Sequence, residues 1–133
     1  MHTIRGFYPA ASVSPAGLEP RILTDKGYEL MTRAESLKTI LSQDPNNTLA
    51  RYGLAMEYAQ SGQTDQALHE FGTLLSANPD YAAGYFMAAQ TLAKADRVPE
   101  AREMLENGIR AAARKGDSHA QSEMQAMLEE ISG

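Results

Sequence analysis

The chain of 133 residues contains no cysteine and no tryptophan. Without cysteine it cannot form a disulfide or offer a thiolate to a metal ion, so redox chemistry does not indicate its compartment. It also has no run of about 18 to 20 apolar residues, the length that a membrane-spanning helix requires. Near the N-terminus Pro9, Pro15 and Pro20 interrupt the apolar residues that a signal peptide would need. These absences make a cytoplasmic location the default expectation.

A basic surface for nucleic acid is also missing. Asp and Glu outnumber Lys and Arg by 17 to 12, which gives a formal net charge of −5 and opposes binding to a phosphate backbone. The one basic cluster consists of Arg110, Arg114 and Lys115, just before Gly116. Cations at the C-terminal end of a helix complement its dipole, so this cluster is interpreted as a helix end. We expect no nucleic-acid partner and no membrane partner.

Residues arranged for catalysis are absent as well. The histidines His2, His69 and His119 stand far apart, and no H-E-x-x-H motif brings two of them onto one helix face. There is no G-x-S-x-G motif, no cysteine nucleophile and no glycine-rich phosphate loop. Acidic residues such as Glu103 and Glu106 follow helical spacing and are interpreted as solvated surface charges. The sequence therefore predicts a protein that is not an enzyme and that has no cofactor and no metal site.

What the chain does contain is a succession of helical patterns. Apolar residues recur at helical spacing in about six segments, and β-branched residues never alternate over four or more positions, so we expect an all-α fold without strands. In the first segment the predicted buried stripe includes Leu37, Ile40 and Leu41. Proline and glycine residues mark most of the helix ends. The predicted helices cover residues 28–42, 48–61, 64–77, 81–95, 99–115 and 117–132, with a turn at 96–98.

The segment from Asp44 to Asp80 organises the rest of the chain. It is bounded by Pro45 and Pro79 and encloses two helical patterns separated by a turn at Gly62. The spacing from Pro45 to Pro79 is the repeat period, because further small or apolar residues coincide when the chain is shifted by that amount. The matched pairs are Ala55 with Ala89, Ala67 with Ala101, and Phe71 with Leu105. A period of this length is typical of a stacked helical repeat.

These residues resemble the tetratricopeptide repeat family, whose helix–turn–helix unit carries the pattern W-x2-L-G-x2-Y…A-x3-F…P. The residues of the first copy that match are Leu54, Tyr58, Ala67, Phe71 and Pro79. Ala55 stands in the place of the glycine, and Arg51 in that of the tryptophan. In the second copy the residues at the pattern positions match the family only in side-chain size, and Tyr85 stands in the place of the tryptophan. Beyond it the corresponding places hold His119, Ser122 and Glu123, so the repeat is expected to end there.

The resemblance implies a right-handed α-solenoid of antiparallel helix pairs. It divides the chain into a half repeat or cap at 28–45, a first repeat at 46–79, a second repeat at 80–115 and a capping helix at 117–132. Residues 1–27 have no sustained period and are expected to form a disordered tail. In an alternative interpretation Met31 is the native start and the preceding residues are an upstream extension. We expect the array to be complete at this size.

The first helix of each repeat carries two stripes. Leu54, Ala55 and Tyr58 form the stripe expected in the core, and a second stripe lies roughly 140° away around the helix. In this family the second stripe lines a concave groove that holds extended or helical peptides. The resemblance therefore places in a shared groove the residues Leu49, Tyr52, Met56, Ala83, Phe86, Met87 and Gln90.

The chemistry of this groove predicts an apolar ligand, because methionine adapts to partners of different shape. We expect a protein-interaction module or scaffold that binds an apolar peptide or helix of another protein. The places that grip acidic chaperone tails in some family members hold Tyr52, Met56, Met87, Asp117 and Gln121, so that ligand is not expected. Two alternatives remain open. Either the half repeat or the last helix covers the groove, or the groove joins two copies into a homodimer.

Overall fold

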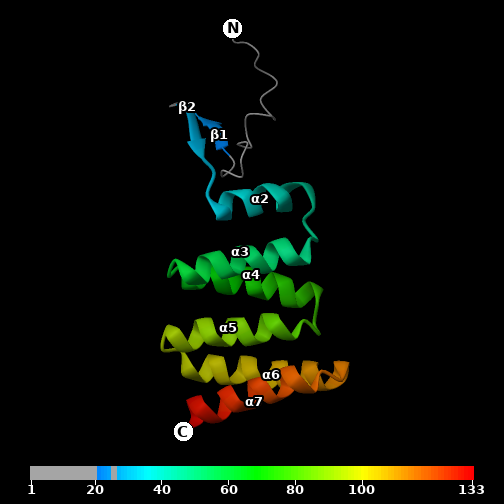
Figure 1. The fold of residues 1–133 in the computed structure, drawn as a ribbon. Helices are drawn as coiled ribbons and strands as arrows, with labels where there is room; N and C mark the ends of the chain where they lie inside the picture. Colours follow the sequence, from blue (N-terminus) through cyan, green and yellow to red (C-terminus); the bar gives the residue numbers. More distant parts are fainter. Residues whose placement is uncertain (1–20, 25–26) are drawn as a thin grey trace.

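The computed structural model describes residues 21–24 and 27–133, in which two short strands are followed by six helices (Figure 1). The elements are β1 (Arg21–Thr24), β2 (Gly27–Leu30), α2 (Arg33–Gln43), α3 (Thr48–Gln60), α4 (Thr64–Ala77), α5 (Ala82–Lys94), α6 (Val98–Lys115) and α7 (Ser118–Ser132). The helices stack in sequence order from α2 to α7, and each runs back across the stack relative to the one before (Figure 1). The predicted all-α solenoid is confirmed. None of these helices has the length and apolar character needed to cross a bilayer.

The repeat period recurs in the backbone. α2 and α4 end one period apart, and in both the N–H of the C-cap residue, Asp44 or Asn78, donates to the carbonyl of the preceding helical turn at 2.9 Å. α3 and α5 likewise begin and end one period apart. The turns that follow them place Gly62 (φ 79°) and Asp96 (φ 62°) in the left-handed region. The repeat is therefore a property of the caps and turns as well as of the apolar residues.

The beginning of the described chain differs from the prediction. β1 pairs with β2 in an antiparallel hairpin, with Arg21 opposite Leu30 and Thr24 opposite Gly27, so the prediction of no strand was wrong here. The helix expected from residue 28 starts at Arg33 instead. Its start is set by a capping box, in which the Thr32 hydroxyl accepts from the Glu35 N–H and the Glu35 carboxylate accepts from the Thr32 N–H. Most of the expected tail, residues 1–20 and 25–26, lies outside the described residues.

The last helix continues the repeat in a different register. The N-cap residues of α5 and α7, Tyr81 and Asp117, lie further apart than one repeat period, because α6 has 18 residues whereas α4 has 14. In this register Met124, which is 1% exposed, takes the leucine place that a fixed shift of one period assigns to Ser122. Met124 packs in the core with Leu105. α7 is thus built as the first helix of a further unit.

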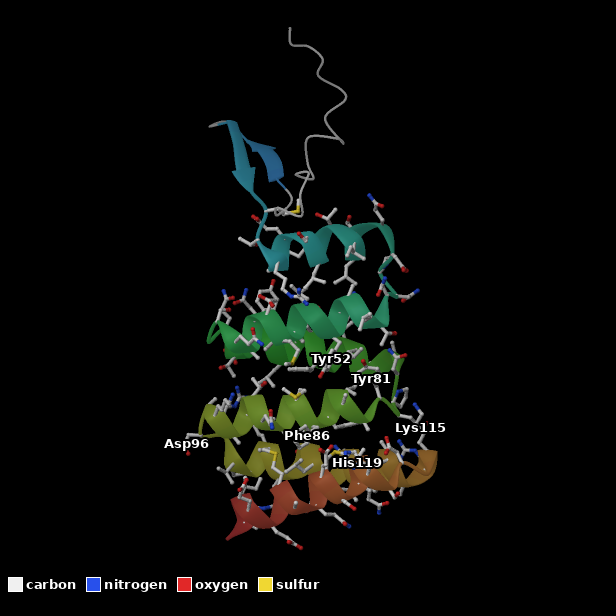
Figure 2. All side chains as sticks on the ribbon, viewed as in Figure 1. Tyr52, Tyr81, Phe86, Asp96, Lys115 and His119 are labelled. Atoms are coloured by element: carbon white, nitrogen blue, oxygen red, sulfur yellow. The ribbon has the colours of Figure 1, made fainter. Side chains whose placement is uncertain are left out.

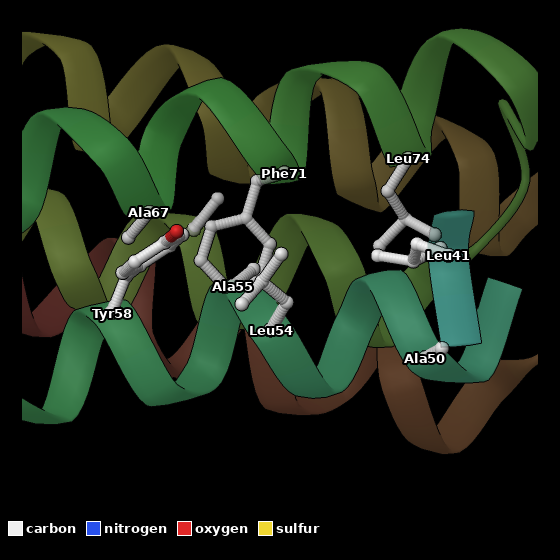
Figure 3. Packing of buried hydrophobic residues seen from close by; sticks show 9 residues of the cluster. Leu41, Ala50, Leu54, Ala55, Tyr58, Ala67, Phe71 and Leu74 are labelled. Atoms are coloured by element: carbon white, nitrogen blue, oxygen red, sulfur yellow. The ribbon is translucent and has the colours of Figure 1, made fainter. Parts of the chain in front are cut away.

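The core lies between paired helices. Phe71 of α4 inserts beside Leu54 of α3, and the fully buried Ala55 and Ala67 allow the two helices to approach closely (Figure 3). Burial of each large apolar side chain stabilises the fold by about 1.5–3 kcal/mol. The core stripe predicted for α3 is confirmed. Ile40 is the exception to the predicted stripe of the first helix, because it is 43% exposed.

Candidate functional site

The seven residues predicted for the groove lie on two equivalent helices. α3 carries three of them and α5 carries four. Spacings of three, four and seven residues place side chains on one side of a helix, and successive first helices of a solenoid repeat the same orientation. Figure 2 shows Tyr52 and Phe86 on successive layers of the stack. Together they form the groove face, which consists of Leu49, Tyr52, Met56, Ala83, Phe86, Met87 and Gln90.

Three clefts open along the groove face. The first cleft, of about 690 Å³, lies between α2 and α3. The second cleft, of about 520 Å³, lies between α3 and α5, and the third, of about 250 Å³, between α5 and α7. Every residue of the groove face lines at least one cleft, and Tyr52, Met56 and Met87 each line two. The shared residues make the three clefts contiguous.

The groove face is neither core nor freely exposed surface. Tyr52 and Phe86 are half-buried, whereas Leu49 is 73% exposed. The Tyr52 ring makes edge contacts with the rings of Phe71 and Tyr81, at centroid distances of 6.4 Å and 5.6 Å. Neither α2 nor α7 buries Tyr52 or Phe86 completely. The core thus fixes these rings from beneath and leaves part of each in contact with solvent.

Tyr52 has the central position on this face, since it lines both the first and the third cleft. Burial raises the pKa of its hydroxyl above the ordinary value of 10.0, and the neighbouring Tyr81 raises it further. Desolvation has this effect because it disfavours the charged phenolate. The hydroxyl is therefore neutral at physiological pH and offers one hydrogen-bond donor and acceptor on a largely apolar surface.

Charged side chains stand at the two ends of the groove face. At the α2 end Arg33 Nε lies 2.9 Å from Glu57 Oε2, and both residues line the first cleft. At the α7 end the third cleft is lined by Asp117 and by His119, whose Nε2 lies 3.5 Å from Glu123 Oε2. The middle of the face is mixed, because the second cleft is lined by Met56 and Met87 and also by Gln90 and Lys94.

Sets of metal ligands do not gather on the described part of this surface. Where the structure describes the chain, no three histidine, aspartate or glutamate side chains come together as metal ligands. The pKa of Glu100 is lowered, but the cause is its hydrogen bond with Arg97, an exposed ion pair at the start of α6.

Sequence reasoning missed the contribution of α2. Leu37 and Ile40 line the first cleft together with Arg33, although the apolar pattern assigned both Leu37 and Ile40 to a buried stripe. At the other end Ala120 and Glu123 of α7 line the third cleft. The signal that would have revealed the α2 wall is the repeat itself. In the described residues α2 follows a strand, β2, and not a helix, so one face of α2 remains open.

Comparisons with known proteins give the same fold. A family model described as the tetratricopeptide repeat matches residues 58–128. A TPR repeat-containing protein of Pseudomonas aeruginosa is 29% identical over 97 residues, which is 73% of this chain and 92% of the relative.

Two solved structures are also similar. The solution structure of a protein from Bordetella parapertussis shares 29% sequence identity and a TM-score of 0.68, and the match covers 77% of this chain and 90% of that chain. SycD, a type III secretion translocator chaperone of Yersinia enterocolitica, shares 21% identity and a TM-score of 0.68, over 74% of this chain and 76% of that chain. The likeness to SycD concerns the fold alone.

Proposed function

Because the chain belongs to the tetratricopeptide repeat family, whose helical arrays generally mediate protein–protein interactions, we propose that it binds an apolar peptide segment or helix of another protein on its groove face. The role is that of an interaction module or scaffold, without catalysis and without a cofactor. The proposed contact residues are Leu49, Tyr52, Met56, Ala83, Phe86, Met87 and Gln90.

The observation that carries this proposal is the continuity of the three clefts. Residues shared between neighbouring clefts join them into one surface that runs from α2 to α7. A ligand that follows this surface contacts three or four helices at once. Recognition by a helix-lined groove of this kind is a recurrent mode for amphipathic peptides.

The side chains on the groove face support an apolar ligand. Met56 and Met87 are flexible and polarisable, so they adjust to the shape of the bound side chains. Tyr52 and Phe86 add rigid aromatic area, and the Tyr52 hydroxyl supplies one polar contact. Rings that the core already holds in place lose little conformational entropy on binding.

A second candidate function is self-association through the same face. It is favoured by Leu49, a large apolar side chain that is 73% exposed on the α3 wall of the first cleft. Two copies that bring their groove faces together would bury this residue in a homodimer. Sedimentation over a wide range of concentrations separates the two functions, because a homodimer dissociates on dilution whereas a monomeric binding module does not change.

Peptide binding is tested with an array of peptides as long as α3. In one set the apolar residues recur every three to four positions, as in a helix, and in the other set every two positions, as in an extended segment. We expect some apolar peptides to bind, and versions with serine at the apolar positions not to bind. Leu49→Ser and Met87→Gln should each weaken binding about tenfold, which corresponds to about 1.4 kcal/mol. Ala126→Ser serves as the matched control, since Ala126 is exposed on α7 and lines none of the three clefts.

Two results would contradict the proposal. One is equal binding of every peptide to the wild-type chain, Leu49→Ser and Met87→Gln. The other is a homodimer that Leu49→Ser dissociates and that excludes all the peptides, which would establish self-association in its place.

A further inference from the structure

The second helix of the half repeat has an open face where the next second helix has a partner. On α4, Ala67, Phe71 and Leu74 face α3 and are buried by it (Figure 3). The residues one repeat period earlier, on α2, are Arg33, Leu37 and Ile40. α2 and α4 also end with the same C-cap geometry, so the two helices are equivalent in structure as well as in sequence.

Exposure distinguishes the two equivalent faces. Leu74 is 1% exposed, whereas its counterpart Ile40 is 43% exposed. Arg33, Leu37 and Ile40 all line the first cleft, and the opposite wall of that cleft is α3 with the 73% exposed Leu49. The first cleft is therefore bounded by the two surfaces that the first helix of a complete repeat would contact, namely its own second helix and the next first helix.

The chain does not form such a helix directly before α2. Residues Gly27–Leu30 form β2, and the capping box at Thr32 starts α2 immediately afterwards. The helices α3 to α7 are each packed into the stack already. Among the described residues no helix covers this face of α2, which therefore suits a helix supplied by another polypeptide.

We infer that the first cleft binds an amphipathic helix of a partner protein, seated on α2 as α3 is seated on α4. This inference rests on the proposed function and sharpens it, because it names a helix as the ligand and the α2 end of the groove as its site. α3 and α5 each have 13 residues, so a helix of similar length fits the cleft. Its apolar residues recur at i, i+3, i+4 and i+7 and contact Leu37 and Ile40 on one wall and Leu49 on the other.

The charge of Arg33 sets the direction of the bound helix. On α4, Ala67 lies beside Tyr58 near the C-terminal end of α3 (Figure 3), so a helix seated in the same way on α2 brings its C-terminal end to Arg33. A helix C-terminus carries a partial negative charge and unpaired carbonyl groups. The Arg33 side chain is 70% exposed, and its Nε lies 2.9 Å from Glu57 Oε2. The guanidinium thus complements a helix that runs antiparallel to α2.

The opposite end of the stack has a different character. α7 is a first helix that no second helix follows. The position where α5 has the small residue Ala89 holds Gln125 on α7, and Gln125 is exposed. Ala89 is fully buried by comparison. Long polar side chains at this place keep α7 solvated, as in the terminal caps of repeat proteins. The proposed helix-binding site is therefore specific to the α2 end of the stack.

The test uses a synthetic peptide with the α3 sequence, Thr48–Gln60, stapled as a helix on the side away from Leu54 and Tyr58. We expect the full chain to bind this peptide and not a scrambled version. Ile40→Ser should weaken binding about tenfold and Arg33→Glu several-fold. Lys38→Glu is the matched control, because it makes the same charge change on α2 outside the cleft, and it should leave binding unchanged.

Met87→Gln separates this inference from the proposed function, because Met87 lines the second and third clefts but not the first. Binding that depends on Met87 and not on Ile40 would overturn the helix seat and leave groove binding intact. If binding depended neither on Met87 nor on Ile40, both the helix site on α2 and the proposed groove binding would be wrong. The proposed site on α2 is also refuted if the peptide shifts the methyl NMR signals of Leu74 and not those of Ile40. That result would mean that the peptide had replaced α3 on α4. A homodimer that Ile40→Ser dissociates would assign the seat to a second copy instead.

Discussion

At the scale of single residues, Arg51 and Tyr85 make the same contact with different chemistry. They lie one repeat period apart in the place that the family reserves for tryptophan, and each donates to the carbonyl of the proline that precedes its helix. Arg51 Nη2 lies 3.0 Å from Pro45 O, and the Tyr85 hydroxyl lies 2.7 Å from Pro79 O. Both side chains therefore tie the start of their helix to the preceding turn. The sequence alone presents these two residues as departures from the pattern.

This equivalence predicts unequal losses on substitution. Tyr85→Phe removes one hydrogen bond and should lower the free energy of unfolding by about 0.5–1.5 kcal/mol. Arg51→Met should cost more, about 1.5–3 kcal/mol, because it also leaves the 15% exposed Glu70 side chain without its charged partner at 2.6 Å. Urea denaturation followed by circular dichroism measures both. An equal loss in the two variants would mean that the Arg51–Glu70 pair contributes nothing to stability.

The turns at Gly62 and Asp96 provide a second residue-scale comparison. Both have positive φ, at which a side chain is strained and glycine is not. Asp96→Gly should therefore raise the free energy of unfolding by about 0.5–1 kcal/mol, and Gly62→Asp should lower it by a similar amount. Thermal melts of the two variants provide the measurement. A loss of stability in Asp96→Gly would show that the Asp96 side chain makes a stabilising contact that outweighs the backbone strain.

At the scale of the elements, Gly108 controls how closely three helices meet. It occupies on α6 the place that Leu74 occupies on α4, and a Cβ added there would lie 2.5 Å from Met124 Sδ of α7 and 2.6 Å from Tyr85 Cβ of α5. The missing side chain thus makes room for Met124 to enter the core. This accounts for the burial of Met124 in a helix whose apolar pattern departs from the repeat.

Two glycine substitutions should consequently have opposite effects. Gly108→Ala forces α5, α6 and α7 apart and should lower the free energy of unfolding by about 1–3 kcal/mol. Gly72→Ala on α4 meets no atom within 4 Å and should raise it by about 0.5–1 kcal/mol through better helix propensity. Chemical denaturation of both variants checks the pair. If Gly108→Ala proved neutral, the helices would have to be loosely packed at this crossing.

The helices from α3 to α7 were predictable, and the segment before them was not. Gly62 and Gly116 mark ends that depend on local backbone chemistry, and local chemistry is readable from sequence. The hairpin at Arg21–Leu30 is only four residues on each side, too short for a pattern to stand out. Helical spacing predicts which side chains of the groove face share one side of a helix, whereas their role as a binding surface is implied by the family resemblance and stays a prediction. The α2 wall was missed because the exposure of Ile40 depends on which helix lies beside α2, and the apolar pattern of α2 alone does not show this; only the repeat register carries that signal.

At the scale of the whole molecule, each helix contacts mainly its neighbours in the stack. Stability in such an array is a sum of local units and the interfaces between them. Leu54 is 3% exposed at one of these interfaces and Leu49 is 73% exposed on the same helix. The two leucines therefore separate the contribution of the core from that of the groove face.

Leu54→Ala should lower the free energy of unfolding by about 2–5 kcal/mol, because it leaves a cavity between α3 and α4. Leu49→Ala should change it by less than about 0.5 kcal/mol, as is usual for exposed positions. A thermal melt of each variant gives the comparison. If Leu49→Ala were the more destabilising of the two, the assignment of the two stripes to core and groove would be reversed.

The shared cap geometry of α2 and α4 makes the unit between them interchangeable. Duplicating residues 46–79 after Pro79 would join backbone that already has the conformation the junction needs. Each added copy would lengthen the groove by about one helix spacing, roughly 8–10 Å. For the peptide binding proposed above, the number of repeats would then set the length of the segment that the groove face can contact.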